Sequence, residues 1–213
     1  MFINTEKKYA PKSLNEFIYP NAETKDIVES YVLGCEEKPL ILYGGSGTGK
    51  SSLQKFIPDA VENHTAKVQR LLCADIKSAA DVHRHYGNNK HLDNLFREND
   101  RYNYIIIEEF LVTNKKISDA FKIELDKRMG VDLTIISTNH FGKIDPGIKS
   151  RAITLELLAC EPSIFYPHAK KIFDMEGVHA SDQELINCLD VTYTLHKDNR
   201  KYYQAMDKLL RTI

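Results

Sequence analysis

Residues 44–51, GGSGTGKS, have the residue types and the spacing of a phosphate-binding loop. Glycines let successive backbone N–H groups turn toward phosphate oxygens, and the start of a following helix favours negative charge. In the pattern G-x-x-x-x-G-K-[ST], the lysine reaches the β- and γ-phosphates and the serine hydroxyl binds Mg²⁺. The alternative is a flexible glycine turn that carries a lysine by chance. We predict a nucleotide-binding loop formed by Gly44, Gly45, Ser46, Gly47, Thr48, Gly49, Lys50, Ser51 and Ser52.

Two adjacent carboxylates, Glu108 and Glu109, follow the apolar run YIII at residues 104–107. Behind a phosphate-binding loop, such a pair can divide two tasks. Glu108 would hold Mg²⁺ through water, because the metal must bridge the β- and γ-phosphates. Glu109 would orient and deprotonate an attacking water. Asn139, which ends the run LTIISTN, would hydrogen-bond that water or the γ-phosphate. The alternative for Glu109 is a solvent-exposed strand end.

Three apolar runs that do not alternate with polar residues must position these side chains, at residues 40–43, 104–110 and 133–139. Such strands indicate a parallel sheet with helices on both faces, and residues 51–62 and 115–129 can supply helices. Ligands bind beyond the carboxyl ends of the strands in such sheets, so we expect the glutamates and Asn139 to converge on the loop. The loop alone fits nucleotide kinases, GTPases and motor ATPases equally well.

Arg151, in the segment GIKSRAITLEL, precedes a short apolar strand expected at residues 153–157. An arginine here is either an ordinary surface charge or a residue that neutralises transition-state charge on the γ-phosphate held by a neighbouring chain. The second role requires an oligomer.

The C-terminal part, from residue 161, has a helical pattern of its own, with turn signals at Pro167 and Gly177 and a helix cap at Ser181. Its last segment places three packing residues on one helical face, namely Tyr203, Met206 and Leu210. We therefore expect two domains, residues 1–158 and 159–213.

Composition narrows the class of protein. The chain has 213 residues, 42% of them hydrophobic and 28% charged, which is typical of a globular protein with a sizeable core. No apolar run is long enough to span a bilayer, and the N-terminus has no secretion signal. Four widely spaced cysteines fit a reducing cytoplasm better than a zinc site or a disulfide framework. A net charge of −1 excludes DNA binding through bulk charge.

Taken together, these residues make the chain resemble an AAA+ ATPase, and within that group the small subunits of clamp loaders, most of all those of bacteriophages. The segment EKKYAPKSLNEFI at residues 6–18 is similar to the family's E-K-Y-R-P signature, which lies beside the adenine and implies contacts from Tyr9 and Pro11. Residues 44–51 match Walker A and residues 108–110 match Walker B. The remaining matches are sensor 1 at Asn139, the arginine-finger motif at Ser150 and Arg151, and the sensor 2 helix at residues 197–210.

This resemblance implies an AAA+ P-loop fold with a small helical lid, ATP and Mg²⁺ as cofactors, and shared ATP sites in a homo- or hetero-oligomer. Arg200 would reach the γ-phosphate. Some residues depart from the family pattern. Glu108 replaces the usual aspartate, which can shift the metal geometry and slow turnover, and Ala10 replaces an arginine. The 213 residues also lack a clamp-loader collar domain, which weakens the expectation of clamp loading itself.

The family also implies contacts with DNA and with a sliding clamp or another replication protein, in the cytoplasm and without a membrane. Candidate phosphate contacts are Arg84, Lys90, Lys115 and Lys116, although each could equally be an ordinary solvated charge. The first alternative function is an ATP-dependent DNA scaffold or loader with little hydrolysis, such as a helicase loader or a transposition regulator. The second is a monomeric kinase of a small molecule, which would need neither Arg151 nor a sensor 2 helix.

Overall fold

The computed structural model describes residues 4–87 and 100–212. The chain forms two compact units. The sheet unit comprises residues 26–44 and 50–156, and the helical unit comprises residues 1–25, 45–49 and 157–213. The expected domain boundary between residues 158 and 159 stays a prediction.

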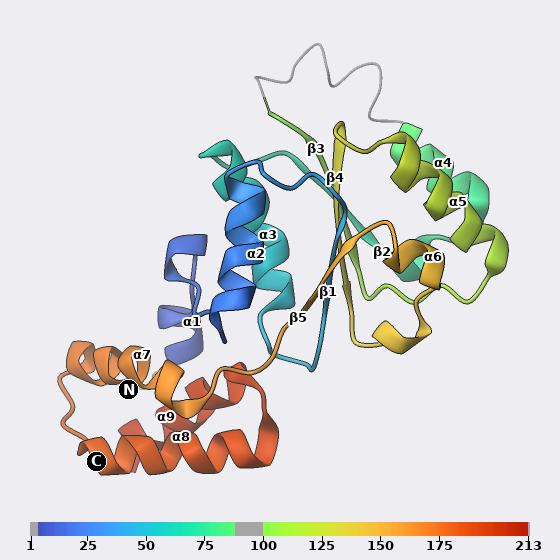
Figure 1. Ribbon diagram of the computed structural model, residues 1–213. Coiled ribbons are helices and arrows are strands. Elements are labelled where there is room, and N and C mark those ends of the chain that lie inside the picture. Colours follow the sequence, from blue (N-terminus) through green and yellow to red (C-terminus); the bar gives the residue numbers. More distant parts are fainter. Residues whose placement is uncertain (1–3, 88–99, 213) are drawn as a thin grey trace. The chain divides into compact units, whose positions relative to one another are not determined.

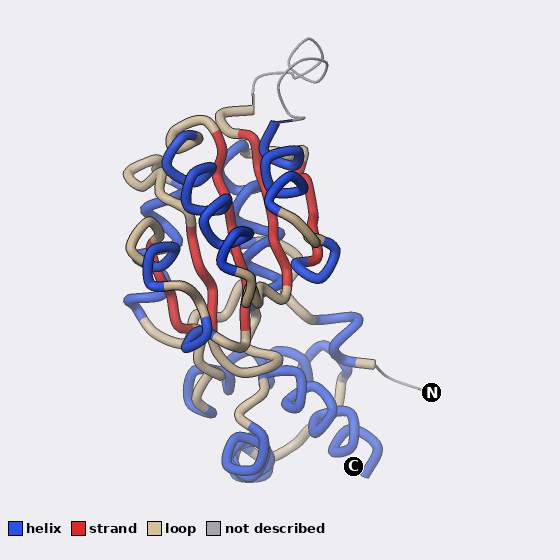
Figure 2. Tube along the Cα trace, turned by 90° about the vertical axis from the view of Figure 1, so that its right-hand side faces the viewer, coloured by secondary structure: helices blue, strands red, loops and turns tan. Residues whose placement is uncertain are grey.

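A five-stranded sheet forms the centre of the sheet unit, as Figure 2 shows. Its strand order is β2-β3-β4-β1-β5, and every neighbouring pair is parallel. The strands are β1 (Leu40–Tyr43), β2 (Val68–Leu72), β3 (Asn103–Glu108), β4 (Asp132–Thr138) and β5 (Ile153–Glu156). The predicted parallel α/β fold is therefore confirmed. β3 ends at Glu108, so the last two residues of the predicted strand at 104–110 lie outside it.

Helices cover both faces of this sheet (Figure 1). α2 (Ala22–Val32, which the sheet unit includes from Asp26) and α3 (Lys50–Glu62) lie on one face. On the other face lie α4 (Ala79–Gly87), α5 (Lys115–Lys127) and the short α6 (Pro146–Lys149). Two 3₁₀ turns, Cys73–Asp75 and Phe141–Lys143, complete the described part of this unit. α5 begins at the side-chain cap of Asn114 and ends two residues before the predicted end at residue 129.

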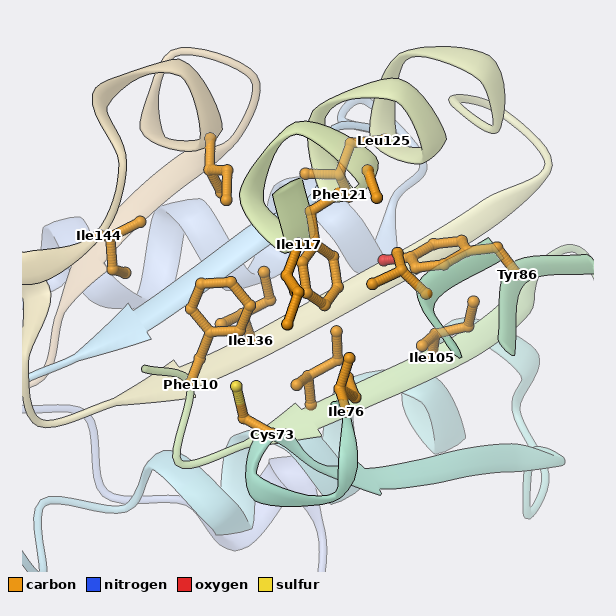
Figure 3. Close-up of a cluster of buried hydrophobic side chains, with 14 of the residues drawn as sticks. Cys73, Ile76, Tyr86, Ile105, Phe110, Ile117, Phe121, Leu125, Ile136 and Ile144 are labelled. Atoms are coloured by element: carbon orange, nitrogen blue, oxygen red, sulfur yellow. The ribbon is translucent and has the colours of Figure 1, made fainter. Parts of the chain in front are cut away.

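The core beneath α4 and α5 is built from strand isoleucines and helix aromatics, as Figure 3 shows. Ile105 and Ile136 lie on neighbouring strands and are fully buried, and Phe121 of α5 packs against them with its ring 5.2 Å from that of Phe110. Each side chain of this size stabilises the fold by about 1.5–3 kcal/mol when fully buried. This packed core therefore holds the ends of β1, β3 and β4 in place.

The helical unit contains α1 (Thr5–Tyr9), α7 (Pro162–Glu176), α8 (Asp182–His196) and α9 (Asn199–Thr212), with a 3₁₀ turn at Leu14–Glu16. Ser181 and Glu184 form a capping box at the start of α8. Gly177 ends α7 in the left-handed conformation, with φ of 68°. The N-terminal segment joins this unit because Thr5 donates a 3.0 Å hydrogen bond from Oγ1 to the Tyr203 carbonyl of α9.

The helical pattern expected from residue 161 is confirmed, whereas one of its turn signals, Pro167, is wrong. Tyr203, Met206 and Leu210 are all buried, as the helical pattern of α9 predicts. Pro167 lies inside α7 rather than in a turn. A helix tolerates an internal proline at the cost of one backbone hydrogen bond, and the buried face formed by Phe165, Ala169 and Ile172 continues through it. In the described part of the chain, no helix has the length and apolar character needed to cross a membrane.

Candidate nucleotide site

The glycine loop runs from the end of β1 to the start of α3, the arrangement expected of a phosphate-binding loop. Gly44 and Gly49 have φ of 134° and 101°, values that residues with a Cβ rarely adopt. Thr48 is 3% exposed and donates a 3.0 Å hydrogen bond to the Gly45 carbonyl, which fixes the turn from within. The Lys50 ammonium donates to the Gly44 carbonyl at 3.0 Å. The loop is therefore folded as a cradle, with its lysine on the first residue of α3.

Three neighbouring strands end beside one another in the sheet unit. β3, β4 and β1 are adjacent and parallel, so their carboxyl ends lie at one edge. Glu108 ends β3, Asn139 directly follows β4, and Gly44 directly follows β1. The topology thus brings the two glutamates, the asparagine and both ends of the loop, Gly44 and Lys50, to the same edge. Ligands of parallel α/β sheets bind at this edge.

Glu109 has an unusual backbone conformation. It is exposed and left-handed, with φ of 53°, a conformation that costs a non-glycine residue about 1–3 kcal/mol. The next residue holds the turn in place, because the Phe110 amide donates to the Ser137 carbonyl and Thr138 Oγ1 donates to the Phe110 carbonyl, both at 2.8 Å. Such strain persists where the surroundings impose it, and it is concentrated at functional sites. Two hydrogen bonds to residues of β4 therefore fix the backbone from which the Glu109 side chain projects.

Glu108 has a partner that the sequence did not reveal. Arg70 of β2 forms an ion pair with it, with 3.3 Å between Nη1 and Oε1, and 44% of the Arg70 side chain is exposed. The register pairs Leu72 with Glu108, which puts Arg70 two residues upstream on the same face of the sheet. Only the pairing of β2 with β3 shows this, because a single arginine in VQRLL carries no signal of its own.

Arg151 lies at the other edge of the sheet. It precedes β5, and β5 runs parallel to β1, so Arg151 is at the amino end of the strands and Glu109 is at the carboxyl end. Its Nε forms an ion pair with Asp126 at 2.8 Å, and its Nη1 donates to the Gly147 carbonyl at 2.7 Å. The structure therefore does not bring Arg151 to the glutamates of its own chain.

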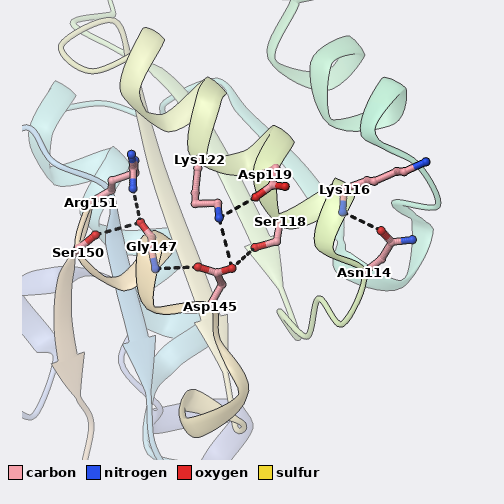
Figure 4. Close-up of polar contacts among 9 residues, drawn as sticks. All are labelled: Asn114, Lys116, Ser118, Asp119, Lys122, Asp145, Gly147, Ser150 and Arg151. Atoms are coloured by element: carbon pink, nitrogen blue, oxygen red, sulfur yellow. Dashed lines mark hydrogen bonds and ion pairs between the residues drawn. The ribbon is translucent and has the colours of Figure 1, made fainter.

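Asp145 anchors the segment that presents Arg151 (Figure 4). It accepts hydrogen bonds from the Ser118 hydroxyl at 2.9 Å and from the Gly147 amide at 2.7 Å, and Lys122 pairs with it at 3.4 Å. The Ser118 hydroxyl, followed by the Gly147 amide and Lys122, holds the pKa of the Asp145 carboxyl below its ordinary value. The Asp145 carboxylate thus links α5 to Gly147 of α6, which lies four residues before Arg151.

The helical unit holds the remaining residues singled out in the sequence. Arg200, at the start of α9, donates from Nη2 to the hydroxyl of Ser46 in the glycine loop at 2.8 Å. Asp198 binds the same guanidinium and raises its pKa. Tyr9 donates to Glu176 at 2.5 Å and lines a pocket of about 340 Å³, which Pro11 does not line. Three lysines line that pocket together with apolar side chains, and an adenine contact of Tyr9 and Pro11 stays a prediction.

Similar solved structures identify the fold class of this chain. Structures of RuvB from Thermotoga maritima match 94% of this chain with TM-scores of 0.69 and 0.70 for two point variants, at 16% sequence identity. A further one, described as the Holliday junction branch migration motor, matches 93% of the chain with a TM-score of 0.60. RuvB has the fold of AAA+ ATPases. This chain has the AAA+ fold. It spans 65% of the two variant chains and 72% of the third. No protein-family model matches the sequence, and no curated protein does.

The candidate DNA contacts lie on helices of the AAA+ fold. Arg84 is on α4 and pairs with Asp81 at 2.5 Å. Lys115 and Lys116 are exposed on the first turn of α5. Lys90 lies outside the described residues. Within the sheet unit the described candidates thus come from two helices that cover the same face of the sheet.

Proposed function

We propose that this chain binds ATP with Mg²⁺ and hydrolyses it. The observation that carries the proposal is the placement of both ends of the glycine loop, Gly44 and Lys50, with two carboxylates and an asparagine at the carboxyl ends of three adjacent parallel strands. Lys50 already lies in the cradle with its ammonium on a carbonyl, a weak partner that phosphate oxygens would replace. The turn fixes the Glu109 backbone, so the Glu109 side chain projects from a defined position.

Each residue has one task in this proposal. The amides of the loop and the Lys50 ammonium bind the phosphates, Glu109 takes a proton from the attacking water, and Asn139 orients that water. The residues present fit a hydrated Mg²⁺, because Ser51 is exposed on the first turn of α3 and Glu108 ends β3 at the same edge. Bound there, the metal would neutralise charge that develops on the phosphates.

We further propose that ATP is shared between chains. Arg151 lies at the sheet edge away from its own glutamates, so it serves a γ-phosphate only if that phosphate belongs to a neighbouring chain. Asp126 and Gly147 meanwhile hold its guanidinium in a defined place. The same placement disfavours a monomeric kinase, in which Arg151 would have no role in catalysis.

DNA is the proposed target of the oligomer, as in a clamp loader. The AAA+ fold, the basic residues on α4 and α5, and the likeness to a branch migration motor support this assignment. The second candidate is an ATP-dependent DNA scaffold or loader that turns over slowly. The ion pair of Glu108 with Arg70 favours it, because a glutamate held by an arginine is less free to serve a metal.

The mass of the protein in solution tests this function. We expect oligomers when a non-hydrolysable ATP analogue and primed duplex DNA are present, and no such oligomers for Lys50→Ala, which loses its phosphate contact. Stimulation of hydrolysis by a sliding clamp would select the clamp-loader assignment. Filaments or rings on DNA that a clamp leaves unchanged would select the scaffold. A monomer under every condition would contradict both.

A further inference from the structure

Asp198, just before α9, lies directly against the glycine loop. A Cβ added to Gly47 would be 1.6 Å from Asp198 Oδ1 and 2.1 Å from its Cγ, so only a glycine fits there. The backbone confirms the contact, because the Asn199 amide donates to the Gly47 carbonyl at 3.2 Å. The Asp198 side chain is 13% exposed. A nearly buried carboxylate therefore faces a loop built to receive negative charge.

Arg200 donates hydrogen bonds both to this carboxylate and to the loop. Its Nη2 donates to Asp198 Oδ2 at 3.1 Å and to Ser46 Oγ at 2.8 Å, and its Nε donates to Asp198 Oδ1 at 3.3 Å. The aspartate and the arginine form a neutral pair, so the positive charge available to a phosphate at the loop is reduced. A phosphate that recruits Arg200 must first draw it from Asp198 and must also tolerate the carboxylate left beside Gly47.

We propose that Asp198 is an internal competitor of nucleotide phosphate at the glycine loop, and that it weakens ATP binding by holding Arg200 and by repelling the phosphates. This inference rests on the proposed function, since it needs ATP at the loop. Asp198 thus tunes affinity and is a positioning residue for Arg200 rather than a catalytic one. A low affinity for nucleotide suits a chain that must release it in a cycle.

Asp198 also has a structural task that the test must preserve. Its Oδ1 accepts a 2.9 Å hydrogen bond from the Arg200 amide at the start of α9. Asparagine caps helices as well as aspartate does and has the same shape. Asp198→Asn therefore removes the charge and keeps the cap. Asp190→Asn is the matched control, because it removes one exposed carboxylate from α8 of the same unit.

Equilibrium titration with fluorescent ATP and ADP gives the readout. We expect Asp198→Asn to bind ATP about 3- to 10-fold more tightly than wild type, as for one partly screened charge interaction, with a smaller gain for ADP. The gain shrinks as salt is raised, because salt screens the repulsion. Asp190→Asn binds like wild type. A purely structural role would give equal or weaker binding, without this dependence on phosphate number or salt.

The outcomes separate this inference from the proposed function. If Lys50→Ala loses binding while Asp198→Asn equals or falls below wild type, the inference is overturned and the function stands. If wild type does not bind ATP, or binds it no better than Lys50→Ala, both are overturned.

A double-mutant cycle checks the contact itself. Gly47→Ala should lower the thermal unfolding midpoint less in an Asp198→Ser background, where the shorter side chain leaves room for the new methyl group. Strain at the positive φ of Gly47 is present in both backgrounds and cancels. Equal costs in the two backgrounds would overturn the contact, and with it the inference.

Discussion

At the scale of single residues, Glu108 and Glu109 are neighbours in the chain but differ in their freedom to move. Glu108 ends a strand, is 33% exposed and pairs with Arg70. Glu109 is exposed and projects from a left-handed turn that β4 holds in place. A carboxylate on a fixed turn suits proton abstraction, which depends on geometry, whereas a metal held through water tolerates some movement of its ligand. The different roles proposed for the two glutamates follow from this difference.

Arg70→Gln is expected to lower the Mg²⁺ concentration that gives half-maximal ATP hydrolysis. The change removes a cation that binds the Glu108 carboxylate, so the carboxylate becomes available to the metal. Exposed ion pairs of this kind are weak, and we expect a shift of about 1.5- to 5-fold. Magnesium titrations of the steady-state rate measure it. Arg84→Gln, which breaks a pair with Asp81 instead, is the control. An unchanged or higher requirement for Mg²⁺ in Arg70→Gln would show that Arg70 does not restrain Glu108.

At the scale of secondary structure elements, local patterns made the central strands and the edge strand β5 predictable and left the other edge strand, β2, undetected. β1, β3 and β4 are buried, and each contains adjacent apolar residues that stand out in the sequence, such as Ile105 and Ile106 of β3. β2 has only half-buried and exposed positions, and VQRLL does not differ from a loop. The glycine loop was predictable because its pattern is local. The turn at Glu109 was not, because bonds from β4, about thirty residues away in sequence, impose it.

The link between α5 and α6 predicts how stability depends on pH. The Ser118 hydroxyl and the Gly147 amide hold the pKa of Asp145 below its ordinary 3.8 in the folded protein. This pairing therefore stabilises the fold above that ordinary value and is lost as the pH falls through the lower folded pKa. Asp145→Asn should unfold at a lower urea concentration than wild type at pH 7, and the difference should disappear in strong acid.

The control for this experiment is Asp174→Asn, because Asp174 is exposed on α7. Its unfolding midpoint should follow that of wild type across the pH range. The contradicting result is that the unfolding midpoints of Asp145→Asn and wild type differ by the same amount from neutral pH into strong acid. That result would rule out the proposed ionic contribution of Asp145.

At the scale of the whole molecule, the two edges of the sheet carry different parts of one proposed site. The carboxyl edge carries Gly44, Lys50 and the glutamates, and the amino edge carries Arg151. The sequence predicted both sets of residues, but only the strand order shows that they lie at opposite edges. Under the role proposed for Arg151, a chain arranged in this way completes its site with a second copy or a related subunit, in a head-to-tail contact of the kind that generates rings or filaments.

Mixing two inactive variants tests this sharing. Glu109→Gln binds ATP and keeps Arg151 but lacks the proposed base, whereas Arg151→Ala keeps Glu109 but lacks the arginine. In a one-to-one mixture, about a quarter of the interfaces combine an intact Glu109 with an intact arginine, so about a quarter of the wild-type ATPase rate should return. Glu109→Gln mixed with Asn139→Ala is the control, because both residues act in the same site and no activity beyond that of the separate variants should return. The absence of rescue in the first mixture would contradict a shared site.

The most direct test of the account is ATP hydrolysis by Glu109→Gln, measured together with ATP binding on the same samples. The amide keeps the size and polarity of the side chain but cannot take a proton. We predict binding close to that of wild type and a single-turnover rate lower by about 10²- to 10⁴-fold, the contribution of a general base. Hydrolysis at the wild-type rate would contradict the assignment of Glu109 and the mechanism built on it.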